Sequence, residues 1–209
     1  MTPKIIAIAG GTGAGKSTVA FALRDKYPDK ISIVHLDDYH PVGARRAIVP
    51  MMAGMQNWDH PEALEWDALI VDLKKIKHGE TLNIQSKNDN LVERSQDENI
   101  EEKETPRFPV TIEPRPIIIL EGYLSLWHPE LREMLDYSFF LDVPHDTRIK
   151  RRTKFLNPDY EQKILIPMHE QYVEPTKEFA NNVINIESLS LEDVVKQIEI
   201  DIMKEVAKT

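Results

Sequence analysis

Cysteine is absent from the 209-residue chain. Its absence excludes disulfide bonds, thiolate metal sites and cysteine nucleophiles. The sequence also lacks an apolar run long enough to span a bilayer, and residues 1–4 lead directly into an apolar segment without a signal peptide. We therefore expect a cytoplasmic protein with no membrane partner.

Positive charge is scarce, since 26 Lys and Arg stand against 35 Asp and Glu and give a formal net charge of -9. This charge repels polyanions, so we expect no nucleic-acid partner, although a phosphate pocket can still be locally positive. Hydrophobic residues make up 41% of the chain, which is ordinary globular usage. The length suits one core and is too short for two ordinary domains, so we expect a single domain over residues 1–209.

Short apolar runs alternate with helical patterns along the chain. We expect strands at residues 5–9, 31–36, 117–120, 138–143 and 183–186, and helices at 17–26, 61–76 and 190–207. This alternation predicts the α/β class, with a parallel sheet flanked by helices.

Residues 81–114 break that alternation. Two short alternating runs, 81–85 and 109–113, flank a polar stretch, which predicts a β-hairpin insertion with a long mobile tip. The tip is rich in acidic residues: Asp97, Glu98, Glu101, Glu102 and Glu104. A solvated acidic loop is favoured over a specific partner-binding role.

The segment from Gly10 to Ser17 matches the pattern G-x-x-x-x-G-K-[ST] between a predicted strand and a predicted helix. Glycines let backbone N-H groups turn inward, and the helix N-terminus favours an anion. Lys16 can reach the outer phosphates, and the Ser17 hydroxyl suits Mg²⁺. The expected nucleotide contacts are Gly11, Thr12, Gly13, Ala14, Gly15, Lys16, Ser17 and Thr18.

Phosphoryl transfer also needs a carboxylate beside the acceptor hydroxyl and cations around the migrating group. Asp37 follows the second predicted strand, where ligands collect in open α/β sheets, and we take it as the catalytic base. A turn or helix-cap role for the Asp37-Asp38 pair stays open. Glu121 ends an apolar strand and is our expected residue on the metal side, with Ser17.

A basic run follows the strand expected at 138–143. It contains Arg148, Lys150, Arg151, Arg152 and Lys154. Such a run is either solvated charge on a helix or a lid that clamps phosphate. For the lid we expect residues of about 145–172.

The order and spacing of these motifs, from the phosphate loop to the basic run, resemble those of the uridine kinase and phosphoribulokinase family of P-loop kinases. The resemblance extends over most of the chain. Asn57-Trp58-Asp59-His60-Pro61-Glu62-Ala63 is similar to a stretch of uridine kinases. The resemblance implies the P-loop NTPase fold, Asp37 as base and Asp59 as the ligand of ribose hydroxyls. It also implies Arg151 and Arg152 as the catalytic arginines of the lid, and homo-oligomerisation. His60 and Arg152 are further expected acceptor contacts. Tyr39 is expected either as an aromatic wall of the acceptor pocket or as a core residue.

Two departures bear on the acceptor. Where uridine kinases carry an aromatic residue and a histidine that recognise the pyrimidine, the nearest residues are Lys87 and Val92. The arginine and glycine cluster of the lid is replaced by residues 155–160. That stretch, with 167–172, looks more like the nicotinamide riboside kinases, a related branch.

The resemblance therefore implies a kinase that transfers the γ-phosphate of MgATP to the 5′-hydroxyl of a uridine- or cytidine-like nucleoside. Nicotinamide riboside or another small alcohol is the alternative acceptor. A P-loop switch protein is the alternative from another class. A GTPase would be expected to carry Asn-Lys-x-Asp, and Ser86-Lys87-Asn88-Asp89 does not satisfy that pattern.

Overall fold

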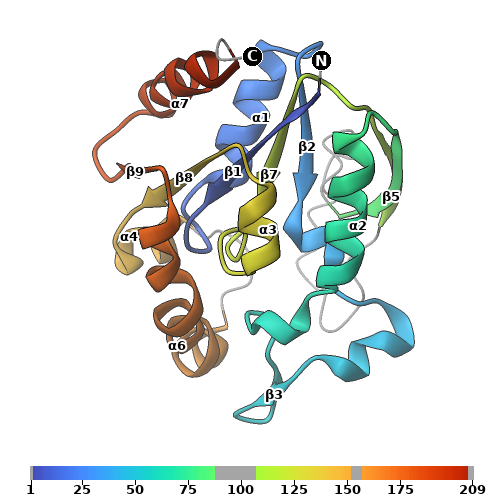
Figure 1. Ribbon diagram of the computed structural model, residues 1–209. Helices are drawn as coiled ribbons and strands as arrows, with labels where there is room; N and C mark the ends of the chain where they lie inside the picture. The colour runs from blue at the N-terminus through green and yellow to red at the C-terminus, as the bar shows by residue number, and fades with distance from the viewer. Residues whose placement is uncertain (1, 88–106, 152–156, 207–209) are drawn as a thin grey trace.

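The computed structural model describes residues 2–87, 107–151 and 157–206 (Figure 1). Its centre is a sheet of five parallel strands in the order β2-β7-β1-β8-β9. These strands are β1 (Lys4–Ala9), β2 (Ile31–His35), β7 (Ile117–Glu121), β8 (Tyr137–Asp142) and β9 (Asn182–Asn185). The predicted parallel α/β fold is confirmed. Because all five strands run the same way, their carboxyl ends meet at one edge of the sheet.

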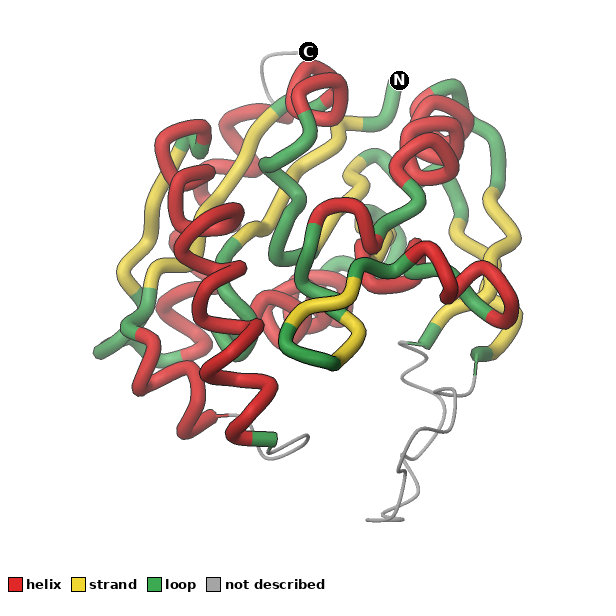
Figure 2. Tube along the Cα trace, turned by 90° about the horizontal axis from the view of Figure 1, so that it is seen from below, coloured by secondary structure: helices red, strands yellow, loops and turns green. Residues whose placement is uncertain are grey.

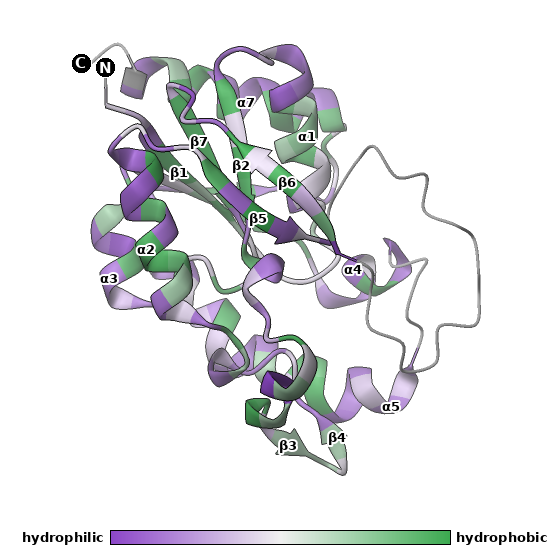
Figure 3. Ribbon diagram, turned by 90° about the vertical axis from the view of Figure 1, so that its right-hand side faces the viewer, coloured by the Kyte–Doolittle hydropathy of each residue, from purple (hydrophilic) through white to green (hydrophobic). Residues whose placement is uncertain are grey.

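Helices cover both faces of this sheet, as Figure 2 shows. Strand β1 explains why: Ile5 and Ala7 belong to one buried apolar cluster, and Ile6 and Ile8 to the other. The first cluster contains residues of α2 (Trp66–Lys77) and α3 (Pro129–Met134), and the second contains residues of α1 (Lys16–Lys26) and α7 (Leu191–Val206). A strand buried on both faces must be apolar throughout, and β1 and β7 are coloured mainly hydrophobic in Figure 3.

The hairpin is formed by β5 (Leu82–Ser86) and β6 (Phe108–Ile112), which pair antiparallel with Leu82 opposite Ile112. Both Leu82 and Ile112 are buried in the cluster that contains α2. The expected mobile tip, with its acidic residues and Val92, lies outside the described residues.

A continuous helix over 61–76 was expected, and this expectation is wrong. A 3₁₀ turn, η3 (Pro61–Ala63), is followed by a break, and α2 begins at Trp66. Leu64 is extended at the break, with φ -118 and ψ 141, and the Glu65 N-H donates to the Tyr39 carbonyl at 2.9 Å. The apolar spacing continues across this break because both pieces face the same core, so the pattern could not reveal it.

Two stretches of short elements lie beside the carboxyl edge. The first comprises η1 (Leu36–Tyr39), η2 (Gly43–Ile48), β3 (Met51–Met52) and β4 (Met55–Gln56). The second comprises α4 (His145–Arg151), α5 (Pro158–Tyr160), the π-helical η4 (Glu161–Leu165), α6 (Ile166–Met168), the π-helical η5 (His169–Val173) and η6 (Glu174–Phe179). Pro167 has no N-H to donate, which disfavours a regular α-helix through this stretch.

No helix within the described ranges is both long and apolar enough to span a bilayer.

Candidate active site

The phosphate loop connects β1 to α1 at the carboxyl edge of the sheet. Gly13 and Gly15 have φ of +85° and +82°, a region that L side chains rarely adopt. Lys16 is buried, and its ammonium group donates to the Gly11 carbonyl at 3.1 Å. Burial lowers the pKa of Lys16, against the opposing charges of Glu121, Asp37 and Asp59. Three carboxylates from distant parts of the chain therefore act electrostatically on the ammonium group of the loop.

Glu121 makes the link between the loop and the sheet. The Ser17 hydroxyl donates to Glu121 Oε1 at 3.0 Å, and His35 Nδ1 lies 2.6 Å from the same oxygen. His35 and Glu121 are partners in the β2-β7 register. Burial opposes a charge on His35, but its hydrogen bond to Glu121 and the charges of Glu121, Asp38 and Asp37 outweigh this and raise its pKa.

This hydroxyl and carboxylate fit a divalent cation, since Mg²⁺ prefers oxygen ligands. In the described part of the chain no three His, Cys, Asp or Glu side chains form a group that could hold a metal ion. Mg²⁺ in kinases is commonly bound by one or two protein ligands together with substrate phosphates, and the pair of Ser17 and Glu121 is consistent with such a site.

The two adjacent aspartates differ in burial. Asp37 is exposed, whereas Asp38 is buried and its Oδ1 accepts the Lys87 N-H at 2.8 Å. Arg107, just before β6, donates to the carbonyls of Asp38 at 2.5 Å and of His40 at 2.8 Å. Burial raises the pKa of Asp38. Asp38 therefore fixes the turn to the base of the hairpin, and Asp37 is the carboxylate left facing solvent.

Residues 57–60, which the sequence predicts to contact the acceptor, are called the acceptor loop. Tyrosine hydroxyls bond to this loop. The Tyr160 hydroxyl accepts the Trp58 N-H at 3.1 Å and donates to Asp59 Oδ2 at 2.8 Å. The Tyr123 hydroxyl donates to the Trp58 carbonyl at 2.7 Å. His60 Nδ1 caps η3 by accepting the Glu62 N-H, and its Nε2 lies 3.2 Å from the Tyr172 hydroxyl.

The two aromatic residues that follow the Asp37-Asp38 pair have partners within the protein. Tyr39 is buried, and its hydroxyl donates to Asp72 on α2 at 3.1 Å. His40 Nδ1 lies 2.8 Å from the Ala63 carbonyl, and its ring packs edge-on against Trp58 with centroids 5.6 Å apart. Burial lowers the pKa of His40. A contact of Tyr39 with the acceptor stays a prediction.

The basic run is divided by burial. Arg148, on α4, is 2% exposed and donates to the Thr12 carbonyl at 3.3 Å, so its side chain packs against the phosphate loop. Lys150 and Arg151 are exposed at the end of α4. Arg152 lies outside the described residues. The roles of Arg151 and Arg152 stay predictions.

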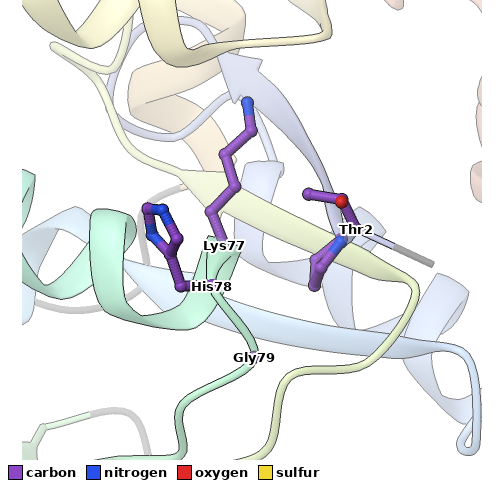
Figure 4. Close-up of a pocket in the computed structure, with 5 residues that line it drawn as sticks. Thr2, Lys77, His78 and Gly79 are labelled. Carbon is purple, nitrogen blue, oxygen red and sulfur yellow. The ribbon is translucent and has the colours of Figure 1, made fainter.

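A separate pocket lies at the opposite edge of the sheet (Figure 4). It is lined by Thr2, Pro3, Lys77, His78 and Gly79, that is, by the chain before β1 and the end of α2. The phosphate loop follows the other end of β1, so this pocket is not part of the candidate active site.

Sequence reasoning missed several residues that build the site. These residues are Tyr123, Tyr160, Tyr172 and Arg107. The contact of Arg148 with the phosphate loop was also missed. The contact of His35 with Glu121 had one available signal, because both are polar residues at the ends of adjacent apolar strands. The other contacts join segments far apart in sequence and carry no local pattern.

Comparison with known proteins decides the family. The model of the Phosphoribulokinase / Uridine kinase family matches residues 5–195. The chain belongs to this family. It is therefore a kinase of the P-loop type, that is, a phosphotransferase that acts on a hydroxyl group.

Relatives within the family are similar over most of their length. The chain is 34% identical to a uridine kinase of Alkaliphilus metalliredigens, covering 99% of this chain and 96% of the relative. It is 32% identical to a uridine kinase of Chlamydia pneumoniae, covering 88% and 82%.

Solved structures support the fold. A possible uridine kinase from Bacillus stearothermophilus superposes with a TM-score of 0.60 at 17% identity, covering 88% of this chain and 90% of the other. Shikimate kinase from Acinetobacter baumannii gives a TM-score of 0.52 at 15% identity, covering 97% and 94%. The P-loop kinase fold is thus shared with kinases of low sequence identity.

Proposed function

We propose that the protein transfers the γ-phosphate of MgATP to the 5′-hydroxyl of a nucleoside. The observation that carries this proposal is that Glu121, Asp37 and Asp59, from three separate segments, all act electrostatically on the buried Lys16 of the phosphate loop. Glu121 also accepts the Ser17 hydroxyl of that loop at 3.0 Å. A cation for phosphate, an exposed carboxylate for a proton and a second carboxylate for a sugar are the groups that phosphoryl transfer to a ribose requires.

On the donor side, loop N-H groups and the Lys16 ammonium hold the outer phosphates. Ser17 and Glu121 would hold Mg²⁺, which when bound offsets charge on the phosphates. Arg151 and Arg152 would close over the transferring group and exclude water. Thr12 and Thr18 complete the expected nucleotide contacts.

On the acceptor side, Asp59 accepts hydrogen bonds from the ribose hydroxyls and so orients the 5′-hydroxyl toward Asp37. Asp37 takes the proton of that hydroxyl as its oxygen bonds to the γ-phosphorus, and ADP leaves with the electrons of the broken bond. His60 and Tyr39 are further proposed acceptor contacts.

Nicotinamide riboside is the alternative acceptor. The segment 155–160, which stands in place of the arginine and glycine cluster of uridine kinases, favours this alternative. It supplies Tyr160, whose hydroxyl donates to Asp59. Both acceptors offer a primary hydroxyl on a ribose, so the proposed roles of Asp37 and Asp59 are the same for either.

The test is ADP release from MgATP with a panel of uridine, cytidine, adenosine, guanosine, nicotinamide riboside, free ribose and glycerate. We expect one ribonucleoside to stimulate ADP release well above the background ATPase. Asp37→Asn should then reduce kcat by about 10²- to 10⁴-fold with ATP binding retained. The proposal of a nucleoside kinase would be overturned if glycerate alone stimulated ADP release, or if no acceptor did so while ATP still bound.

A further inference from the structure

The Tyr160 hydroxyl lies between two consecutive residues of the acceptor loop. It accepts the Trp58 N-H at 3.1 Å and donates to Asp59 Oδ2 at 2.8 Å. Tyr160 comes from α5, about a hundred residues further along the chain. One phenol oxygen therefore fixes both the backbone before Asp59 and the carboxylate of Asp59.

The same stretch of backbone is held from the other side. The Tyr123 hydroxyl donates to the Trp58 carbonyl at 2.7 Å, so both backbone polar groups of Trp58 bond to tyrosines. Burial, the charge of Asp59 and the hydrogen bond to Asp59 all raise the pKa of Tyr160. The phenol thus remains a protonated donor throughout the pH range of an assay.

We infer that Tyr160 is the positioning residue for the acceptor's ribose: its hydroxyl fixes the Asp59 carboxylate in the orientation that accepts the sugar diol. This inference rests on the proposed function, because it assigns the ribose contact to Asp59. Tyr160 acts through Asp59 and takes no part in proton or phosphoryl transfer. Its effect is therefore confined to acceptor binding.

The test combines Tyr160→Phe with a matched pair of acceptors, the best ribonucleoside and its 2′-deoxy analogue. We expect the KM for the ribonucleoside to rise about tenfold, which corresponds to one hydrogen bond to a charged group. The KM for the 2′-deoxy analogue and the KM for ATP should change by less than about twofold. Calorimetric binding of each acceptor without ATP gives a second readout of the same difference.

Tyr27→Phe is the matched control, since the Tyr27 hydroxyl also donates to a carboxylate, that of Glu199 on α7, remote from the acceptor loop. It should leave every kinetic constant unchanged. Asp59→Asn serves as the second variant: it should abolish the preference for ribose over deoxyribose, and adding Tyr160→Phe should cause no further loss.

The inference is overturned if Tyr160→Phe weakens both acceptors equally, because the hydroxyl would then have only a structural role. It is also overturned if neither acceptor is affected, or if the losses from Tyr160→Phe and Asp59→Asn add. Failure of the proposed function is seen separately, as a wild-type protein that phosphorylates no nucleoside.

Discussion

The guanidinium group of Arg148 packs directly against Gly11: a Cβ placed on Gly11 would lie 2.5 Å from Arg148 Nη1 and 2.7 Å from Cζ. Gly13 is equally constrained, since its Cβ would lie 2.5 Å from the Arg148 carbonyl oxygen. Arg148 therefore limits both positions: its side chain packs on Gly11, whereas its backbone carbonyl, together with the positive φ of Gly13, requires glycine at position 13. The start of α4 and the nucleotide loop form one packed unit.

Arg148→Met should therefore weaken ATP binding by about tenfold, because the Thr12 carbonyl loses a charged donor and the loop loses its support. Lys150→Met is the matched control, since Lys150 lies on the same helix but is exposed. Equilibrium titration with a fluorescent ATP analogue measures both. Equal effects of the two substitutions would show that Arg148 acts only as part of the helix's net charge.

Glu121→Gln should raise the Mg²⁺ concentration for half-maximal activity by about tenfold or more, because an amide replaces the carboxylate beside Ser17. Binding of ATP without Mg²⁺ should remain within about twofold of wild type. A Mg²⁺ titration of ADP release, paired with metal-free nucleotide binding, gives both quantities. An unchanged Mg²⁺ dependence would show that Glu121 is not a ligand of the metal ion.

Arg107→Met should lower kcat by about tenfold to a hundredfold with little change in the KM for ATP. Arg107 holds the carbonyls of Asp38 and His40, so its loss frees the turn that carries Asp37. The control is Arg115→Met, whose guanidinium pairs with Glu113 near the end of the same hairpin. Steady-state kinetics with varied ATP concentration measures both constants for each variant. A change in the KM for ATP alone, with kcat unchanged, would contradict the prediction.

The sheet and the phosphate loop could be predicted because their signals are local. A strand buried on both faces is apolar throughout, and a loop that turns its N-H groups inward requires glycine at fixed positions. Both constraints act on neighbouring residues. The expected bounds of the five strands accordingly lie within one residue of those observed.

The contacts that stabilise the proposed acceptor site could not be predicted, because they join distant segments of the chain. Tyr160 and Asp59 are separated by 101 positions, and Arg107 and Asp38 by 69. Arg148 was expected in a basic run that is either solvated charge or a phosphate-clamping lid, and its burial against the phosphate loop was not foreseen, since its charge carries no sign of burial. The break at Leu64 is similar: it depends on the hydrogen bond from Glu65 to Tyr39, which no apolar spacing records.

His169 should make the fold sensitive to acid. Burial and the positive charge of Arg148 lower the pKa of His169 to about 4, against the opposing charge of Glu174. An unfolded histidine titrates near pH 6.5. Between about pH 6.5 and pH 4 the unfolded chain therefore binds more protons at this position than the native protein, and the stability it contributes is lost as the pH falls.

His169→Gln should remove this contribution, which amounts to about 2 kcal/mol between pH 7 and pH 5. Urea denaturation at the two pH values measures the difference in the free energy of unfolding for each protein. His78→Gln is the control, because His78 is exposed at the end of α2. If His169→Gln lost as much stability on acidification as the wild type, the acid sensitivity would have to come from other groups, since glutamine does not titrate.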